Sequence, residues 1–184
     1  MNRRIITGCL ALLICGAALA QDAAAPQFPQ PQKEHEWLKH FAGEWDAEGE
    51  CVMGPGQPPM KMKATITGRT LGAFWAMTEI RGDMAGMQMT GVMTVGYDPE
   101  KKKYVGTWVD SMTDHLWHYT GSVDESGKKL TLEAVGPDMT QPGKKMNYRD
   151  VWEVKDKDNI VMTSACEKDG KWFTFATNNL RRKK

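Results

Sequence analysis

Residues 87–110 read MQMTGVMTVGYDPEKKKYVGTWVD, and the pattern of this stretch predicts the fold. It holds two strand-like runs, 87–97 and 103–110, separated by a turn that Asp98 and Pro99 mark. The same succession of short runs and turns begins at Gly43 and continues to the end of the chain. The other expected strands are residues 44–53, 60–70, 73–81, 115–123, 129–135, 146–155, 159–166 and 171–182.

About ten short strands at even spacing predict an all-β protein, with one antiparallel sheet closed into a barrel. The faces of the expected strands are mixed in polarity, as where Tyr104, Trp108 and Asp110 share one face. The core of a β-sandwich would be more purely apolar on one face. A small barrel tolerates a partly polar interior and can hold a small molecule there.

Residues 1–20 have the pattern of a secretory signal peptide. Arg3 and Arg4 precede a mainly apolar stretch, and Ala18-Leu19-Ala20 forms a small-x-small cleavage site. The apolar stretch is too short to span a membrane. The alternatives are a buried N-terminal helix and a lipoprotein signal at 6–9. We therefore expect the mature protein in the periplasm or outside the cell.

The rest of the chain is expected to form a lead-in and one domain. Residues 21–34 are rich in Pro, Gln and Ala, which is typical of a flexible, extended segment. Trp37, Leu38 and Phe41 then have helical spacing, so we expect a short helix that covers one end of the barrel. Residues 35–184 are expected to form a single β-barrel domain.

The charge of the mature chain argues against a general attraction to nucleic acid or to a membrane. Without the leader, the chain has 22 basic and 23 acidic residues, a balance that gives no such pull. It has no second apolar stretch long enough to span a bilayer. We expect a monomer without a cofactor.

Two cysteines, Cys51 and Cys166, remain after cleavage of the leader. An even number in an exported chain permits a disulfide between them, provided that the closed sheet brings their strands together. The alternative is a pair of free, buried thiols. The chain has no Cys-x-x-Cys or paired Cys/His spacing, so no zinc site is expected.

Methionine is unusually frequent, with 13 in the chain. Met84, Met87, Met89 and Met93 form a cluster, and the last three alternate along one expected strand. Thioethers suit Cu(I), which makes copper binding one hypothesis. The other is that flexible Met side chains fill a core or line a cavity for an apolar ligand.

Two polar motifs raise questions of chemistry. Asp110, Ser111 and His115 invite comparison with a hydrolase, but Asp110 and Ser111 lie on opposite faces of a strand and no Gly-x-Ser-x-Gly sequence is present. His115 alternates with Trp117 on one face, from which it could bind the polar end of a ligand. Arg149 could hold a carboxylate inside the barrel, or form an exposed ion pair.

Gly43-Glu44-Trp45, just after the expected helix, resembles the Gly-x-Trp signature of the calycins. This resemblance implies that Trp45 packs at the closed end of a calycin-like barrel. It also implies that a basic residue of the last strand, Arg181 or its neighbour Arg182, lies across the ring. The same pattern is similar to nitrobindin-type barrels, but residues 173–182 lack the histidine by which those proteins hold haem.

Longer motifs lie in the stretches at 49–56, 93–98, 104–109, 136–140, 148–151 and 169–172. Together they resemble an uncharacterised, mostly bacterial group, the domain-of-unknown-function family 1579. The resemblance extends over nearly all of residues 35–184. It implies the barrel fold and implies no known activity.

The sequence therefore predicts a module that binds a small, largely apolar ligand inside a barrel. One alternative is an enzyme, a hydrolase or isomerase, that uses His115 and Asp110 in the same cavity. Another is an interaction protein of the cell envelope whose barrel is filled by side chains. The candidate ligand-binding residues are Trp75, Met77, Met89, Trp108, His115, Trp117 and Arg149.

Overall fold

The computed structural model describes residues 28–52, 54 and 56–184. The expected signal peptide, 1–20, lies outside the described residues, as do residues 21–27 of the expected lead-in. Residues 31–184 form one compact unit. Its elements are the 3₁₀ helix η1 (Lys33–Phe41) and the strands β1 (Gly43–Cys51), β2 (Met60–Leu71), β3 (Trp75–Met84), β4 (Met87–Asp98), β5 (Lys103–Asp110), β6 (Trp117–Val123), β7 (Lys129–Pro137), β8 (Lys145–Asp156), β9 (Asn159–Lys168) and β10 (Lys171–Arg182).

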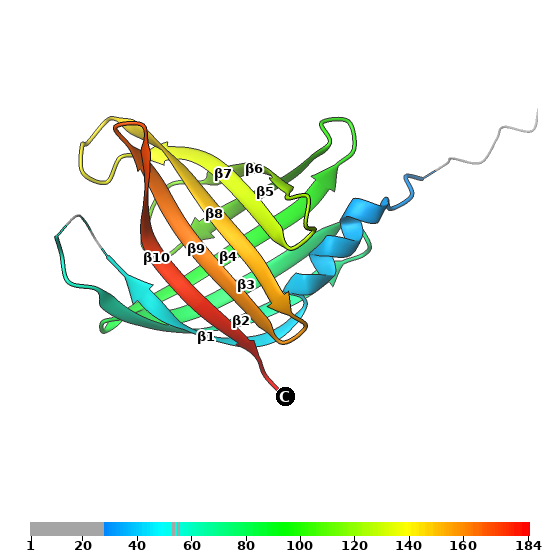
Figure 1. Ribbon diagram of the computed structural model, residues 1–184, viewed down its shortest axis with the longest axis horizontal. Coiled ribbons are helices and arrows are strands. Elements are labelled where there is room, and N and C mark those ends of the chain that lie inside the picture. Colours follow the sequence, from blue (N-terminus) through cyan, green and yellow to red (C-terminus); the bar gives the residue numbers. More distant parts are fainter. Residues whose placement is uncertain (1–27, 53, 55) are drawn as a thin grey trace, which may run out of the picture. The chain divides into compact units, whose positions relative to one another are not determined.

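The ten strands form a closed antiparallel barrel (Figure 1). Each strand pairs with the next along the chain, and β10 returns to pair with β1. The predicted all-β barrel with a short N-terminal helix is thus confirmed. Within the described residues, no helix has the length and apolar character needed to cross a bilayer.

The helix η1 packs across one end of the barrel, as its apolar spacing predicted. Trp37, Leu38 and Phe41 are all buried. The indole Nε1 of Trp37 donates a hydrogen bond of 3.0 Å to the carbonyl oxygen of Gly127, in the connection between β6 and β7. The hydroxyl of Tyr104 donates one of 2.7 Å to the carbonyl oxygen of Glu34. These bonds fix η1 to the β6–β7 connection and to the start of β5.

The half of the barrel next to η1 is filled by side chains. Because neighbouring residues of a strand point to opposite faces, the inward rows of the strands meet here as one core. Its members include Leu38, Phe41, Trp45, Ile66, Val95, Leu130, Leu132, Trp152, Ile160 and Leu180. The interior therefore has room for a ligand only further from η1.

Of the two expected partners of Trp45, Arg181 and Arg182, it is Arg182 that lies across the ring. The guanidinium carbon of Arg182 stands 4.0 Å from the centre of the ring. The register explains the difference, because Trp45 lies opposite Arg182 while Arg181 lies opposite Asp46 on the outer face. Arg182 also donates from Nη1 to the carbonyl oxygen of Ala42 at 2.6 Å.

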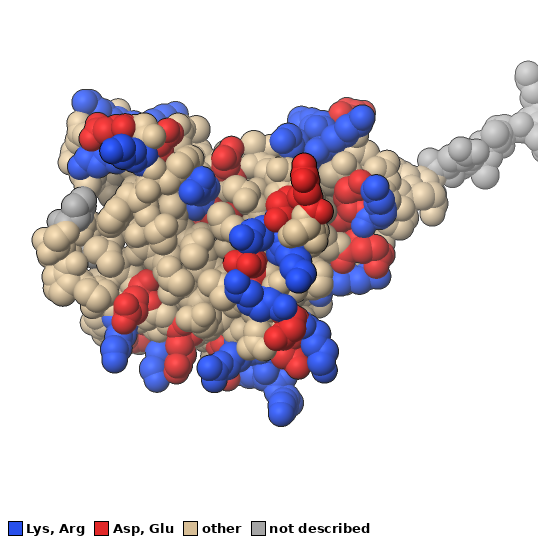
Figure 2. Space-filling view, viewed as in Figure 1, with Lys and Arg blue, Asp and Glu red and all other residues tan. Residues whose placement is uncertain are grey.

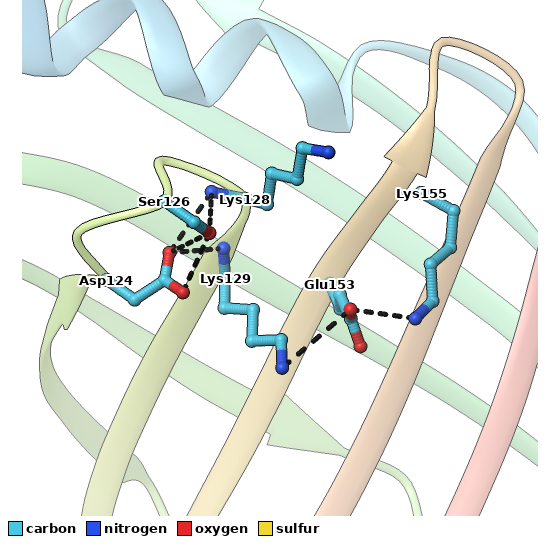
Figure 3. Close-up of polar contacts among 6 residues, drawn as sticks. All are labelled: Asp124, Ser126, Lys128, Lys129, Glu153 and Lys155. Atoms are coloured by element: carbon cyan, nitrogen blue, oxygen red, sulfur yellow. Dashed lines mark hydrogen bonds and ion pairs between the residues drawn. The ribbon is translucent and has the colours of Figure 1, made fainter.

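Basic and acidic side chains are spread over the visible outer surface of the barrel (Figure 2). The turn between β6 and β7 is an example (Figure 3): Oδ1 of Asp124 accepts hydrogen bonds from the backbone N–H groups of Lys128 and Lys129, at 3.1 and 3.0 Å. Nearby, Glu153 pairs with Lys129 and with Lys155, at 3.8 and 2.7 Å. The Asp124 bonds satisfy backbone donors of the turn, while such exposed ion pairs contribute little to stability.

Candidate functional site

The half of the barrel away from η1 encloses a cavity of about 850 Å³. β1 starts beside η1, so the segment that follows it, Val52 and Gly54, lies at the opposite end. Both line the cavity, as do Met139 and Thr140 of the connection between β7 and β8. The segment that follows β1 and the connection between β7 and β8 therefore contribute to the mouth of the cavity.

The wall of the cavity is rich in thioethers and aromatic rings. Eight of the 11 methionines at described positions line it. They are Met62, Met84, Met89, Met93, Met112, Met139, Met146 and Met162. The aromatic lining residues are Trp108, Trp117, Tyr119, Tyr148, Trp152, Trp172, Phe173 and Phe175. Such a wall is apolar, yet its unbranched side chains can adapt to the shape of what they enclose.

Two tryptophans lie close against the wall because glycines face them. A Cβ atom on Gly91 would come within 2.1 Å of the ring of Trp108, and one on Gly136 within 2.1 Å of the ring of Trp117. Trp108 is fixed further by a hydrogen bond of 2.7 Å from its Nε1 to Oδ2 of Asp110. The glycines thus give both rings room at the wall.

Three polar side chains meet inside this apolar wall, and we call them the Asp150 cluster: Tyr119 of β6, Asp150 of β8 and Ser164 of β9. The Tyr119 hydroxyl donates a short hydrogen bond to Oδ2 of Asp150. The Ser164 hydroxyl donates to Oδ1 at 2.5 Å. The register places Asp150 directly opposite Ser164, so both point into the cavity.

Burial changes the titration of this cluster. It raises the pKa of Asp150, because removal from water disfavours the charged carboxylate, although the bonds from Ser164 and Tyr119 act in the opposite direction. It also raises the pKa of Tyr119 well above its usual value, and the nearby Asp150 and Asp110 add to that rise. Tyr119 therefore stays a neutral hydrogen-bond donor at physiological pH.

A family model matches residues 30–182, and its description is a protein of unknown function (DUF1579). The chain belongs to the DUF1579 family. No curated protein matches it.

Solved structures share the fold of the DUF1579 chain at low sequence identity. The S-type phycobiliprotein lyase CPES from Guillardia theta is 14% identical, with a TM-score of 0.56, and the match covers 84% of this chain and 99% of that one. Rv2717c from M. tuberculosis is 12% identical, with a TM-score of 0.58, over 84% of this chain and 100% of that one. At these identities the similarity concerns the fold alone.

Three of the seven candidate ligand-binding residues line the cavity of the DUF1579 barrel. They are Met89, Trp108 and Trp117. His115 precedes β6 and packs its ring edge-on against Trp117, with centroids 4.9 Å apart. It is not among the residues of the cavity wall.

The other three candidates lie on the outer face of the sheet. Trp75 is 41% exposed and lies over Gly96, while its neighbour Ala76 is buried. Met77 follows the same alternation, with Thr78 buried beside it. Arg149 stacks on the ring of Trp172, 4.3 Å from its centre. An alternating pattern divides a strand into two faces but does not say which face points into the barrel. In these strands the face that carries the three candidates points outward.

The Asp150 cluster was missed for the same reason. The row Tyr148, Asp150, Trp152 and Val154 faces inward, and its apolar members distinguish it from the row Arg149, Val151, Glu153 and Lys155. The apolar residues at alternate positions on both sides of Asp150 indicate that this row of β8, with Asp150 in it, faces the interior. Tyr119 carried a similar signal, because it shares a face with Trp117.

The geometry does not support a disulfide between Cys51 and Cys166, which are free thiols. Cys51 is on β1 and Cys166 on β9, and β10 lies between these strands. Two strand spacings amount to about 9.6 Å, beyond the roughly 7 Å limit for bonded Cα atoms. Burial raises the pKa of both thiols.

The arrangement of Asp110 and His115 offers no acid–base pair. Asp110 accepts hydrogen bonds from Trp108 and from the backbone N–H groups of Met112 and Thr113. The four histidines, all at described positions, lie outside the cavity lining. Among residues 28–52, 54 and 56–184, no group of three or more His, Cys, Asp or Glu side chains could hold a metal ion.

Proposed function

We propose that this DUF1579 barrel binds a small, largely apolar molecule in its interior. The observation that carries the proposal is the cavity of about 850 Å³, walled largely by methionine and aromatic side chains and containing the Asp150 cluster. Ligand pockets of proteins typically have volumes of about 300–1,000 Å³, mostly apolar walls and a few placed polar groups. The cavity argues against the alternative of a barrel filled by side chains.

The lining indicates the general shape of the ligand. Methionine side chains repack easily and make favourable contacts with aromatic rings. The tryptophans at the wall offer flat apolar surfaces. A ligand with an aromatic or other polarisable body would therefore use most of this wall, while its polar end would meet the Asp150 cluster.

Export of the protein is part of the proposal. The support is the sequence pattern of residues 1–20, with its basic start and its small-x-small site before Gln21. The mature protein would then meet its ligand outside the cytoplasm. The intact mass of the protein recovered from the exported fraction of its host would correspond to a chain that starts at Gln21.

Binding can be tested with the neutral fluorescent reporter N-phenyl-1-naphthylamine, using two matched variants on β10. Ala176 lines the cavity, so Ala176→Phe would place a ring inside it. Asn179 is exposed and lies opposite Glu48 on the outer face, so Asn179→Phe adds the same ring outside. We expect saturable binding of one reporter to the wild type and to Asn179→Phe, and binding at least tenfold weaker for Ala176→Phe. Equal binding by all three proteins, or no binding to the wild type, would contradict the proposal.

A further inference from the structure

We infer that the ligand of this cavity carries a cationic, amine-type head group that Asp150 holds. The inference rests on the proposed function, because it concerns the polar end of the same ligand. It is carried by the placement of Asp150: a carboxyl group on a largely apolar cavity wall, bonded to two neutral donors and to no basic residue.

Hydrogen bonding leaves Asp150 with free accepting capacity. A carboxylate has two oxygens and about four lone-pair sites. In the structure each oxygen accepts one bond, Oδ2 from Tyr119 and Oδ1 from Ser164. Two donors that converge on both oxygens suit an ionised carboxylate, because a protonated carboxyl would use one oxygen as a donor. Asp150 is half-buried and lines the cavity, so a ligand there can reach it.

The protein supplies no countercharge for this carboxylate. None of the ion pairs formed by the described residues includes Asp150. Its neighbour Arg149 is not among the residues of the cavity wall, and its guanidinium is engaged in stacking on the ring of Trp172. The basic residues on the cavity lining are all exposed: Lys63, Lys168 and Lys171. A carboxylate removed from water is stabilised by a cation that donates hydrogen bonds to it, and here the ligand is left to provide one.

The walls around Asp150 also favour a cation over an anion. Trp117 and Trp152 line the same cavity, and indole faces attract cations. Four further carboxyl groups line the cavity, and Asp138 is the buried one among them; they are Asp83, Asp110, Asp138 and Asp169. An anionic head group would meet Asp110, Asp138 and Asp150, which are less exposed than the three lysines of the lining.

The test compares three ligands that share one apolar body. They are 2-(1-naphthyl)ethylamine, 2-(1-naphthyl)ethanol and 1-naphthylacetic acid, and each competes with N-phenyl-1-naphthylamine at pH 7. Hydrogen bonds to charged groups contribute about 1.5–3 kcal/mol. We therefore expect the amine to bind on the order of tenfold or more tightly than the alcohol and the acid.

Three variants separate the charge of Asp150 from its structural role. Asp150→Asn removes the charge and should reduce the advantage of the amine to less than about threefold, while the reporter still binds. Tyr119→Phe keeps the carboxylate, so the preference for the amine should persist. Glu133→Gln is the control. It removes an exposed carboxyl group of β7, which lies opposite Arg149 of β8, and this variant should bind the three ligands as the wild type does.

The outcomes distinguish the two proposals. Wild-type binding of the amine no tighter than that of the alcohol or the acid would overturn the inference, even with a bound reporter. The same holds if Asp150→Asn is folded and keeps the full preference. If the reporter itself does not bind to the wild type, the proposed function fails and the inference fails with it.

Discussion

Asp150 is the residue where burial and charge conflict most directly in the cavity. Burial raises its pKa above the usual value of 3.8, because water no longer stabilises the carboxylate. The ionised form is therefore less favourable in the folded than in the unfolded chain. As the pH rises from about 3.8 through the raised pKa of the folded state, the free energy of unfolding therefore decreases because of Asp150. At higher pH the contribution of Asp150 stays at this lower level.

Asp150→Asn should therefore gain stability relative to the wild type as the pH rises through that window. The free energy of unfolding of both proteins would be measured by urea denaturation between pH 3.5 and 7. The value for the variant minus that for the wild type should increase with pH and then stay constant. Glu133→Gln serves as a correction for the change in net charge. If that difference in the free energy of unfolding is constant with pH, or decreases as the pH rises, the raised pKa of Asp150 is contradicted.

Arg182 is the residue that joins the last strand to Trp45 and to the end of η1. A cation–π contact contributes about 0.5–2 kcal/mol, and Arg182 also donates to the carbonyl oxygens of Ala42 and Lys157. We expect Arg182→Met to lower the free energy of unfolding by about 2 kcal/mol. Arg181→Met, on an exposed side chain of the same strand, should change it by less than about 0.5 kcal/mol. Equal effects in chemical denaturation would show that the Trp45 contact contributes little.

At the scale of single elements, η1 tests whether the closed end depends on packing. Leu38 is 1% exposed, so Leu38→Ala should lower the free energy of unfolding by about 2–5 kcal/mol. Lys39→Ala, on the exposed side of the same helix, should have an effect below about 0.5 kcal/mol. Denaturation curves would check both values, and a small effect of Leu38→Ala would mean that η1 is not part of the cooperative unit.

The order of β1, β10 and β9 determines the state of the two cysteines in the barrel. Because β10 separates Cys51 from Cys166, a chain that starts at Gln21, as proposed, should contain two free thiols. Thiol titration of unreduced, denatured protein should count two per chain. A count of zero would show that the strands around β10 are arranged differently. In the native state both thiols should react slowly, since burial raises the pKa of each.

The elements themselves could be predicted from the sequence, but their inward faces only in part. Turn residues such as Asp98-Pro99 end the strands, so all ten strands were expected within a few residues of their bounds. A bulge in β10 shows why faces are harder. The register shifts between Thr174 and Ala176, so Phe173 and Ala176 both line the cavity although strict alternation assigns them to opposite faces.

At the scale of the whole molecule, closure of the sheet explains both the stability and the space of the barrel. Pairing of β1 with β10 joins the first strand to the last and leaves neither as a free edge. Large side chains fill the end near η1, whereas methionines and wall-bound tryptophans leave the other end hollow. The hollow end could not be predicted from the sequence, because its volume depends on which rows of side chains face each other across the barrel.

The central claim, an interior that holds a small ligand, is tested most directly by native mass spectrometry. The protein would be purified from the exported fraction of its own host and measured before and after denaturation, with its complex with N-phenyl-1-naphthylamine as the control for retention in the gas phase. We expect a mass excess that disappears on unfolding and that Ala176→Phe lacks. A bare polypeptide mass, under conditions that preserve the reporter complex, would contradict the claim.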